Sequence, residues 1–424
     1  MMREKIISVV GLGYIGLPTA AMFAQAKTKV IGVDVVSHVV DTINQGKIHI
    51  VEPGLEEIVQ RAVRDGYLRA SLTAEPADAF LIAVPTPFKA DYEPDLSYIE
   101  SAAQLIAPVL KKGDIIILES TSPVGATEQM VAWLRELRSD LEFPSEENQN
   151  PDVYVAYCPE RVLPGKVIEE LISNDRIIGG LTPKCALLAE SVYRIFVKGQ
   201  LLHTNARTAE MSKLTENSFR DVNIAFANEL SMICDKLDIN VWELINLANH
   251  HPRVNVLQPG PGVGGHCIAV DPWFIVSKTP EQARLIKMAR EVNDSKPEWV
   301  INKVNAAAIE FLQQNPHKLL NHVIISCFGL SFKADIDDLR ESPAMGITLQ
   351  LAIKYPSQVL VVEPNVEVIP LDLQEAKVEL VDLSEGLQAD ILVMLVDHQE
   401  FKSINYKQLV GKQIIDTRGI WTGE

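Results

Sequence analysis

The sequence has few cysteines, no long apolar run and no excess of positive charge. Five of the 424 residues are cysteines, and they lie far apart without a Cys-x-x-Cys pair. This spacing argues against a disulfide framework or a zinc ribbon and favours a reducing compartment, so we expect a cytoplasmic protein. No apolar run reaches the ~20 residues that span a bilayer, so we expect no membrane insertion.

The charge imbalance narrows the range of partners. Lys and Arg total 39 while Asp and Glu total 56, which leaves a net charge of −17. Such a chain is a poor partner for nucleic acid or an anionic membrane. An anionic small molecule is still compatible, because helix N-termini and a few arginines bind phosphate locally. We expect no metal site, because the adjacent pairs His250-His251 and His266-Cys267 have no carboxylate cluster beside them.

The N-terminal segment has the pattern of a dinucleotide-binding unit. A β-rich apolar run leads directly into the glycine turn GLGYIG at residues 11–16, and a helical and a second β-rich segment follow. In such a unit Gly11 permits the tight turn, Gly13 lets a pyrophosphate approach the backbone, and Gly16 lets the helix pack close to the sheet. Asp34 ends the second strand, where a carboxylate accepts from the ribose hydroxyls and repels a 2′-phosphate. NAD is therefore expected rather than NADP.

The order of patterns along the chain predicts an α/β fold. We expect two Rossmann-like doubly wound parallel-sheet domains, joined by a central helical domain with one long helix. The expected strands cover residues 5–10, 30–34, 79–84, 114–119, 153–157, 323–328, 359–363, 390–396 and 413–416. The expected helices cover residues 17–26, 205–237, 241–249, 281–293, 297–313 and 345–354.

A thiol stands at the end of a glycine-rich loop. Gly264 and Gly265 come just before His266 and Cys267. Two glycines allow a ligand to come close to the thiol, and the histidine or a helix start would favour the reactive thiolate. A cysteine outside a disulfide is also commonly a small buried apolar residue, and the local sequence supports both interpretations of Cys267 equally. For the other four cysteines we expect burial.

The long central helix is amphipathic, with one broad apolar face made of Met211, Leu214, Val222, Ala225, Phe226, Leu230 and Ile233. Lys213, Asn217 and Arg220 recur at i, i+4 and i+7 on the opposite side. That spacing is most often typical of a solvated face.

Glu160 and Arg161 follow a strand pattern, and ligands of doubly wound sheets bind beyond the carboxyl ends of strands. Glu160 is therefore either a general base or an ion-pair partner of Arg161, and the sequence leaves both open.

Taken together, these segments resemble the nucleotide-sugar 6-dehydrogenases, the family that includes the UDP-glucose and GDP-mannose dehydrogenases. The resemblance covers the whole chain in order and is carried by GLGYIGLP (11–18), STSPVG (120–125), CPER (158–161), KLTEN (213–217), GGHC (264–267) and DLRESP (338–343). Four further strings are similar to the bacterial branch that oxidises UDP-N-acetyl-D-mannosamine: IHIVEP (48–53), AVPTPF (83–88), NHHPR (249–253) and CIAVDPW (267–273). One departure weakens transfer from the UDP-glucose branch, because Ile268-Ala269-Val270 follows the cysteine where many members have Pro and Lys.

The resemblance implies a four-electron oxidation of a primary alcohol to a carboxylate, with two NAD reduced. It also implies a role in bacterial surface polysaccharide synthesis of the enterobacterial common antigen type. Cys267 would be the nucleophile that forms a thiohemiacetal and then a thioester. Lys213 and Asn217 would stabilise the oxyanion, and Lys213 with Asp271 would serve the alcohol step. Glu160 would be the base for the hydrolytic water.

The resemblance also implies binding roles and a domain division. The cofactor would contact Gly11, Gly13, Tyr14, Ile15, Gly16, Asp34, Thr86, Thr121, Thr127 and Arg340. The UDP-sugar would contact Glu160, Arg161, Lys213, Asn217, Arg220, His251, Arg253, Gly264, Phe332, Lys333 and Arg418, with Arg253 reaching across a dimer. An NAD-binding domain would cover residues 1–204, a central helical domain that forms a homodimer 205–315, and a UDP-sugar-binding domain 316–424.

Other functions share parts of these patterns. Within the family the alternative is a UDP-N-acetylglucosamine 6-dehydrogenase. A two-electron hydroxyacid dehydrogenase also combines a Rossmann and a helical domain but needs no cysteine, and an NAD-sensing module needs no chemistry at all. The yield of NADH per sugar separates these classes as two, one or none.

Overall fold

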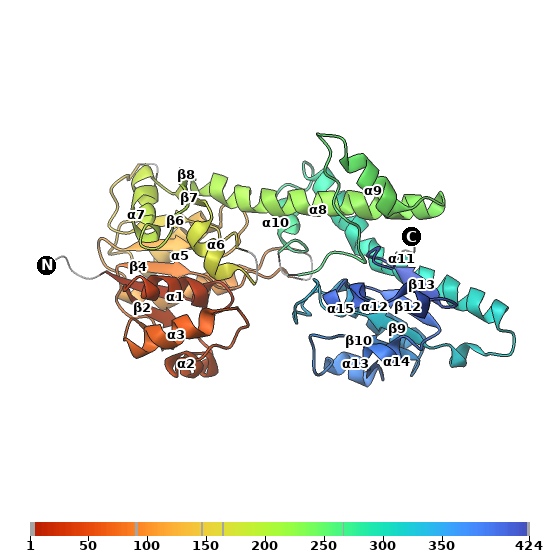
Figure 1. The fold of residues 1–424 in the computed structure, drawn as a ribbon. Helices are drawn as coiled ribbons and strands as arrows, with labels where there is room; N and C mark the ends of the chain where they lie inside the picture. Colours follow the sequence, from red (N-terminus) through yellow and green to blue (C-terminus); the bar gives the residue numbers. More distant parts are fainter. Residues whose placement is uncertain (1–4, 90–91, 146, 163–164, 266, 422–424) are drawn as a thin grey trace. The chain divides into compact units, whose positions relative to one another are not determined.

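The computed structural model describes residues 5–89, 92–145, 147–162, 165–265 and 267–421. The chain forms two compact units. Unit 1 comprises residues 1–216 and 273–280, and unit 2 comprises residues 217–272 and 281–424 (Figure 1). No helix within the described ranges is both long and apolar enough to cross a membrane.

Unit 1 contains an eight-stranded sheet in the order β3-β2-β1-β4-β5-β6-β7-β8. The strands are β1 (Ile6–Val10), β2 (Lys29–Val33), β3 (Leu68–Ser71), β4 (Ala79–Ile82), β5 (Ile115–Leu118), β6 (Tyr154–Tyr157), β7 (Arg176–Gly180) and β8 (Leu201–Asn205). The first six strands follow the Rossmann order, with parallel pairing and a switch point between β1 and β4. The five strands expected here are confirmed, whereas β3, β7 and β8 were not predicted.

One pairing departs from the expected parallel sheet. Strand β7 runs antiparallel to β6, and β8 then runs parallel to β7. Tyr157 pairs with Gly179 and Ala156 with Gly180. The reversal therefore places the beginning of β7 at the edge of the sheet where β5 and β6 end.

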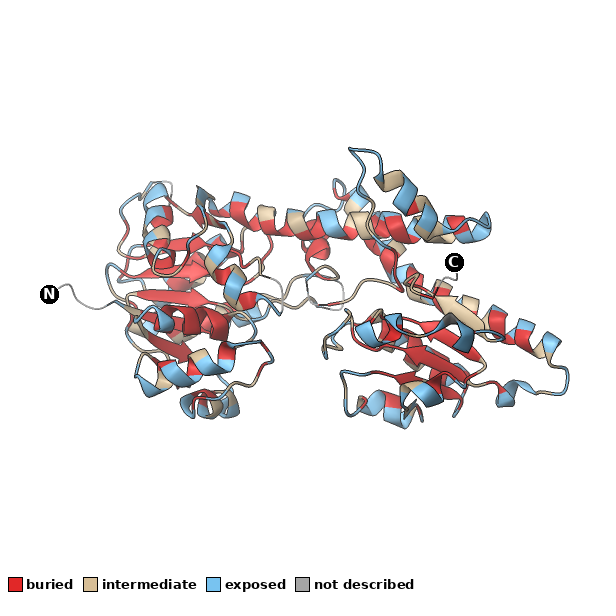
Figure 2. Cartoon of the chain, viewed as in Figure 1, coloured by how far each residue is buried: buried red, intermediate tan, exposed pale blue. Residues whose placement is uncertain are grey.

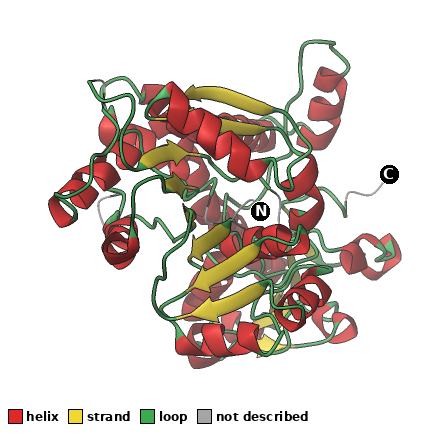
Figure 3. Ribbon diagram, turned by 90° about the vertical axis from the view of Figure 1, so that its left-hand side faces the viewer, coloured by secondary structure: helices red, strands yellow, loops and turns green. Residues whose placement is uncertain are grey.

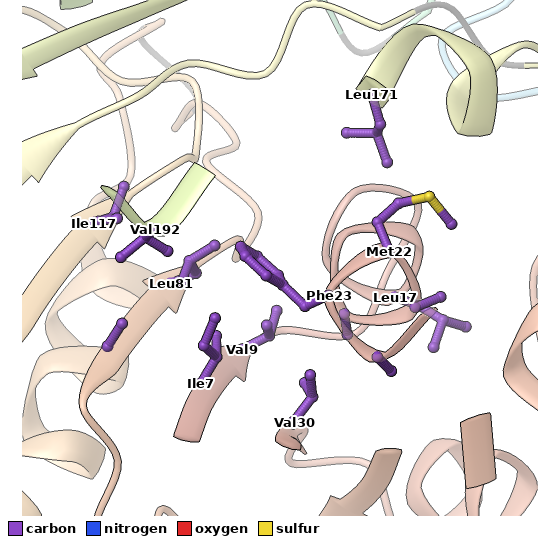
Figure 4. Close-up of a cluster of buried hydrophobic side chains, with 14 of the residues drawn as sticks. Ile7, Val9, Leu17, Met22, Phe23, Val30, Leu81, Ile117, Leu171 and Val192 are labelled. Carbon is purple, nitrogen blue, oxygen red and sulfur yellow. The ribbon is translucent and has the colours of Figure 1, made fainter. Parts of the chain in front are cut away.

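Helices cover both faces of this sheet, which explains why its strands are apolar on both sides (Figure 3). They are α1 (Gly16–Gln25), α2 (Ser37–Asn44), α3 (Leu55–Arg64), α4 (Ser97–Ile106), α5 (Ala126–Leu137), α6 (Val167–Ser173) and α7 (Pro183–Tyr193), with a short 3₁₀ turn at Ala107–Val109. Figure 4 shows how α1 joins this core: Phe23 points toward Val9 and Leu81, while Met22 points toward Leu171 of α6.

Four helices follow β8 and precede the second sheet in the sequence: α8 (Ala206–Lys236), α9 (Val241–Asn249), α10 (Asp271–Lys278) and α11 (Arg284–Gln314). Helix α11 runs continuously through Pro297, so the expected division into two helices was wrong. A proline removes one backbone hydrogen bond and strains the preceding turn. Buried residues on both sides of it, among them Asn293, Lys296 and Val300, belong to one packed face that keeps the helix together.

The prediction for the faces of α8 was also wrong in part. Leu214 and Ala225 are buried as expected, but Phe226 and Ile233 are exposed. The buried stripe also contains polar side chains, namely Glu210, Lys213, Asn217, Asp221 and Asn228, while Arg220 is exposed. Figure 2 shows buried, intermediate and exposed residues along α8. Specific partners satisfy most of this stripe, such as Arg290 for Asp221 and Asn293 for Asn228, and hydrophobic periodicity cannot detect such partners.

Unit 2 contains a five-stranded sheet in the order β11-β10-β9-β12-β13, and its neighbouring strands are parallel. The strands are β9 (Ile325–Phe328), β10 (Val359–Val362), β11 (Glu379–Leu380), β12 (Ile391–Met394) and β13 (Gln413–Asp416). The helices around it include α12 (Pro343–Lys354), α13 (Leu371–Glu375), α14 (Leu383–Gly386) and α15 (Gln399–Lys402), with 3₁₀ turns at Leu320–His322 and Tyr406–Gln408. This is a second Rossmann-like arrangement, with its switch point between β9 and β12. The predicted fold class is confirmed.

Candidate active site

The glycine turn between β1 and α1 has the shape of a phosphate cradle. A Cβ on Gly16 would lie 1.8 Å from the carbonyl oxygen of Gly11, so only glycine allows the helix to begin this close to the turn. A Cβ on Gly13 would meet nothing within 4 Å, so the backbone is open to a ligand there. Ile15 at the N-cap of α1 makes no side-chain hydrogen bond, which leaves the positive end of the helix to an anion.

Asp34 is held rigidly at the end of β2. Its carboxylate accepts hydrogen bonds from the backbone N–H groups of Leu12 (2.9 Å) and Val36 (3.0 Å). The first of these bonds ties the carboxylate to the glycine turn itself. The residues present therefore fit NAD, whose pyrophosphate would lie on the turn and whose ribose would lie near Asp34.

The three threonines predicted near the cofactor lie at the edge where strands end. The Thr86 hydroxyl donates to the carbonyl oxygen of Thr121 (2.5 Å), which joins the segments after β4 and β5. The Thr127 hydroxyl donates to Glu210 of α8 (2.6 Å), and the same carboxylate accepts the N–H groups of Gly125 and Thr127 at the start of α5. Thr127 thus anchors α8 to α5, and its role toward NAD stays a prediction.

Asp34 is expected to decide the choice of cofactor. We predict that kcat/KM for NAD is at least ~100-fold higher than for NADP, because a close like-charge contact costs several kcal/mol. Asp34→Asn should reduce this ratio, since the amide carries no charge. Asp41→Asn on the exposed side of α2 is the matched control and should leave the ratio unchanged. Equal use of both cofactors by the unaltered protein would contradict the prediction.

Glu160 lies at the carboxyl edge of the first sheet in a buried ionic cluster. Its Oε2 accepts a hydrogen bond from Arg176 (2.6 Å), and its Oε1 accepts the backbone N–H of Arg161 (2.6 Å). The Arg161 side chain instead forms an ion pair with Glu216 (2.8 Å). The interpretation of Glu160 as an ion-pair partner of the Arg161 side chain is therefore wrong. Sequence reasoning missed Arg176, whose only local signal is a charged residue at the head of the apolar run RIIGG.

The Arg161–Glu216 ion pair also relates Glu160 to α8. Glu216 lies three residues after Lys213, so both are on adjacent turns of one helix face. The pair therefore holds the Glu160–Arg161 segment beside the part of α8 that carries Lys213. Lys213 is itself almost buried, with 9% of its surface exposed, which is the opposite of a solvated face.

Cys267 lies in a turn directly before α10 and is exposed, whereas the other four cysteines are buried as expected. Its carbonyl oxygen accepts the N–H of Asp271 (2.9 Å), the first residue of this helix. The interpretation of Cys267 as a buried apolar residue is wrong. Burial raises the pKa of Cys158 and of Cys327 to about 12, which keeps those thiols unreactive. His266, which was expected to assist the thiol, lies outside the described residues.

The two glycines before Cys267 make room for neighbouring protein atoms, and the closeness of a ligand to this loop stays a prediction. A Cβ on Gly264 would lie 2.4 Å from the carbonyl oxygen of Glu341 and 2.7 Å from Pro343. Gly265 has a positive φ of 81°, and a Cβ there would lie 3.0 Å from the ring of Phe332. The glycines thus allow the Cys267 loop to pack against the segment that follows β9.

That segment lies at the carboxyl edge of the second sheet, where ligands of such sheets bind. Phe332 and Lys333 follow β9, and Arg418 follows β13 with its guanidinium bound to Asp397 (2.7 Å). Arg418 also lies beside the loop that leads to the cysteine, since a Cβ on Gly260 would be 2.7 Å from its Nη1. Two of the candidate sugar-nucleotide residues, Phe332 and Arg418, therefore lie beside the thiol loop within unit 2.

Asn217 and Asp271 form a direct pair in the same unit. The Asn217 amide donates to the Asp271 carboxylate, and both side chains are buried. Asp271 is the first residue of α10, four residues after Cys267. Asn217 and Asp271, two of the predicted catalytic residues, are thus joined through their side chains. The backbone carbonyl of a third, Cys267, accepts the backbone N–H of Asp271.

The other predicted binding residues are more exposed. Arg220, His251, Arg253 and Lys333 lie on the surface, and the His251 ring accepts the N–H of Arg253 (3.3 Å). Arg340 is bonded to Asp338 in unit 2 (2.6 Å), and its role toward the cofactor stays a prediction. The roles of Tyr14 and Ile15 at the glycine turn also stay predictions.

The fold and these residues define an NAD-dependent dehydrogenase of nucleotide sugars, with a dinucleotide cradle on one sheet and a thiol loop seated on the edge of a second. Three family models cover most of the chain. They are the UDP-glucose/GDP-mannose dehydrogenase NAD binding domain (residues 5–197), central domain (207–295) and UDP binding domain (326–423). The chain belongs to the UDP-glucose/GDP-mannose dehydrogenase family. The domain boundaries predicted at residues 204 and 315 stay predictions.

Several relatives are similar over almost their whole length. A UDP-N-acetyl-D-mannosamine dehydrogenase of Yersinia pestis is 62% identical over 99% of this chain and 100% of that protein. An NDP-N-acetyl-D-galactosaminuronic acid dehydrogenase of Ralstonia solanacearum is 60% identical over 99% of this chain and 97% of that protein. The solved structure of a UDP-D-ManNAc dehydrogenase from Pyrococcus horikoshii superposes with a TM-score of 0.87 at 39% identity, covering 99% and 96% of the two chains.

Proposed function

We propose that this dehydrogenase oxidises UDP-N-acetyl-D-mannosamine to UDP-N-acetyl-D-mannosaminuronate, a four-electron oxidation that reduces two NAD. The observation that carries the proposal is the exposed Cys267 thiol, in a loop packed against the segment that follows β9 at the carboxyl edge of the second sheet. The relatives named for this substrate support the choice of sugar. The product suits bacterial surface polysaccharide synthesis in the cytoplasm, of the enterobacterial common antigen type.

The thiol explains how one site performs two oxidations. NAD, when bound, accepts a hydride from the sugar carbon in each of them. The first oxidation leaves an aldehyde, which has no hydride to lose until a nucleophile makes its carbon tetrahedral. Cys267 adds to the aldehyde and forms a thiohemiacetal, and loss of the second hydride leaves a thioester on the sulfur. Water then cleaves the thioester and releases the carboxylate and the thiol.

The neighbouring side chains have matching tasks. One N–H of the Asn217 amide is bonded to Asp271, which orients the amide and leaves its second N–H for the oxyanion of the thiohemiacetal. The ammonium group of Lys213 would supply a second donor, and such donors are often worth ~3–4 kcal/mol each. Lys213 with Asp271 would take the proton from the alcohol, and Glu160 would take the proton from the hydrolytic water.

The number of NADH formed per sugar tests the proposed reaction. With limiting UDP-N-acetyl-D-mannosamine we expect two NADH for each sugar consumed, whereas one would indicate a two-electron dehydrogenase and none an NAD-sensing module. The same assay on the N-acetylglucosamine and N-acetylgalactosamine epimers tests the choice of sugar. A higher kcat/KM for either epimer would overturn that choice and leave the four-electron chemistry in place.

We also propose that the protein is a homodimer formed through α8. An exposed apolar stripe runs along this helix through Phe219, Phe226 and Ile233 and continues to Leu237, just after the last helical residue. The spacing of seven, seven and four residues places all four on one side, as in helices that pair lengthwise. The exposed fractions of Phe219 and Phe226 are 69% and 52%, large values for aromatic side chains. A second copy of the same stripe is the matching apolar partner.

A double substitution tests this dimer. Phe219→Glu with Phe226→Glu should convert the dimer to a monomer in sedimentation, because charges directly opposed across the symmetry axis repel and the apolar area is lost. Leu187→Glu on α7 changes an equally exposed leucine (58%) outside the stripe and should leave the mass unchanged. A double variant that sediments like the unaltered protein would contradict the proposed interface.

A further inference from the structure

A cluster of buried ionisable side chains lies next to Glu160 and takes no part in the steps above. It comprises Arg176 at the start of β7, Glu119 after β5, Cys158 after β6 and Tyr193 at the end of α7. These elements meet because β7 is antiparallel to β6. The pairing of Tyr157 with Gly179, continued along both strands, sets position 176 opposite position 160.

The guanidinium of Arg176 lies between two carboxylates. It donates to Glu160 at 2.6 Å and approaches Oε1 of Glu119 at 3.8 Å. It also stacks over the ring of Tyr193, 4.7 Å from the centroid, and its Nη1 lies 4.0 Å from the Cys158 sulfur. Only 3% of Arg176 is exposed, so its charge acts in a medium where ionic interactions are strong.

Glu119 has fewer hydrogen-bond partners than Glu160. Its Oε1 accepts the hydroxyl of Tyr193 at 2.6 Å, but its Oε2 has no hydrogen-bond partner among the described residues. Burial raises the pKa of Glu119 to about 7, against the opposing effect of Arg176. One buried cation thus faces two acids, of which Glu160 holds the close contact and Glu119 gains or loses a proton near neutral pH.

We propose that Arg176 is the positioning residue that holds the Glu160 carboxylate in place as a base, and that Glu119, when ionised, competes for the same guanidinium. The inference rests on the proposed role of Glu160 in thioester hydrolysis. Removal of the cation should disfavour the carboxylate form of Glu160, which is the form that acts as a base. Removal of Glu119 takes away a competing charge only above about pH 7, where Glu119 is ionised. The remaining groups that face the pair, Tyr193 and Cys158, are unchanged in both cases.

The test follows the decay of the Cys267 thioester in quenched single turnovers, measured by intact-protein mass between about pH 5 and 9. In Arg176→Met, the acidic limb of the pH–rate profile for thioester decay should move to higher pH by ~1–3 units. This is the range that an adjacent opposite charge commonly controls. Glu119→Gln, which is nearly isosteric with the protonated acid, should leave the acidic limb in place, because Glu119 has a pKa of about 7 and is already uncharged at lower pH. Arg176→Lys should lie between Arg176→Met and the unaltered protein.

The control Phe196→Leu alters packing beside the same guanidinium without changing charge. It should lower thermal stability and leave the acidic limb in place. An acidic limb that stays in place in Arg176→Met, or that moves as far in Glu119→Gln as in Arg176→Met, would overturn the inference. If Arg176→Met does not fold, Arg176→Lys gives the decision, because a limb that stays in place in that variant would also overturn it.

An error in the proposed role of Glu160 can be told apart from an error in the proposed role of Arg176. If Glu160→Gln accumulates the thioester while Arg176→Met leaves the limb unmoved, only the positioning role of Arg176 is overturned. If Glu160→Gln accumulates no thioester, the base itself is misassigned and the inference is overturned together with it.

Discussion

Cys267→Ser is expected to lower four-electron turnover by ~10³-fold or more, because a hydroxyl is a far poorer nucleophile than a thiolate near neutral pH. The exposed position of the thiol, in the turn that precedes α10, supports this role because a substrate can reach it. NADH formation per sugar and the mass of the protein after quenching are the measurements. No covalent adduct should form at residue 267.

The matched control is Cys234→Ala, which removes a buried thiol from α8 and should keep two NADH per sugar. Normal rates with two NADH per sugar in Cys267→Ser would remove the thiol from the mechanism. Direct attack of water on the aldehyde would then have to supply the tetrahedral carbon for the second oxidation.

Glu160→Gln is expected to slow thioester hydrolysis by ~10²–10⁴-fold, the usual loss on removing a general base. Both hydride transfers precede this step and do not need Glu160. A pre-steady-state burst approaching two NADH per active site should therefore come before slow turnover. A sugar adduct on Cys267 should accumulate and be visible by intact-protein mass.

The substituted amide can still accept the N–H of Arg161, so the loop should keep its shape, although Arg176 loses its carboxylate partner. Glu169→Gln on the exposed side of α6 makes the same charge change and should behave like the unaltered protein. Slow turnover without an adduct would contradict the assignment. It would indicate that Glu160 serves stability or affinity, and Lys213 with Asp271 would become the leading candidates for the base.

Expectations that rest on local sequence agree well with the structure. The glycine turn and Asp34 lie within one strand–turn–helix–strand unit, so their spacing alone predicted a cradle that the backbone then forms. The strands with continuous apolar runs were also predictable, because both faces of their sheets are buried. Strand β8 was missed because its residues are mostly exposed and therefore carry no apolar pattern.

Helix α8 shows what hydrophobic periodicity cannot predict. Hydrophobic spacing assumes that apolar residues pack inside and polar residues face water. In α8 several buried positions are polar, because partners from distant segments, such as Thr127 and Asp271, satisfy them. Several exposed positions are apolar, among them Phe219 and Phe226, which the proposed dimer would cover. Both departures depend on contacts that one helix considered alone does not contain.

The sequence by itself thus determined the order of the elements, the cofactor turn, the acid at the end of β2 and the family, because these depend on neighbours along the chain. Only the tertiary structure decided that Cys267 is exposed and that Glu160 pairs with Arg176 rather than with the Arg161 side chain. The physical reason is the antiparallel turn-back of β7, which brings a charge sixteen residues away to within hydrogen-bonding distance. Strand direction depends on pairing between segments, so no local pattern of residue types predicts it.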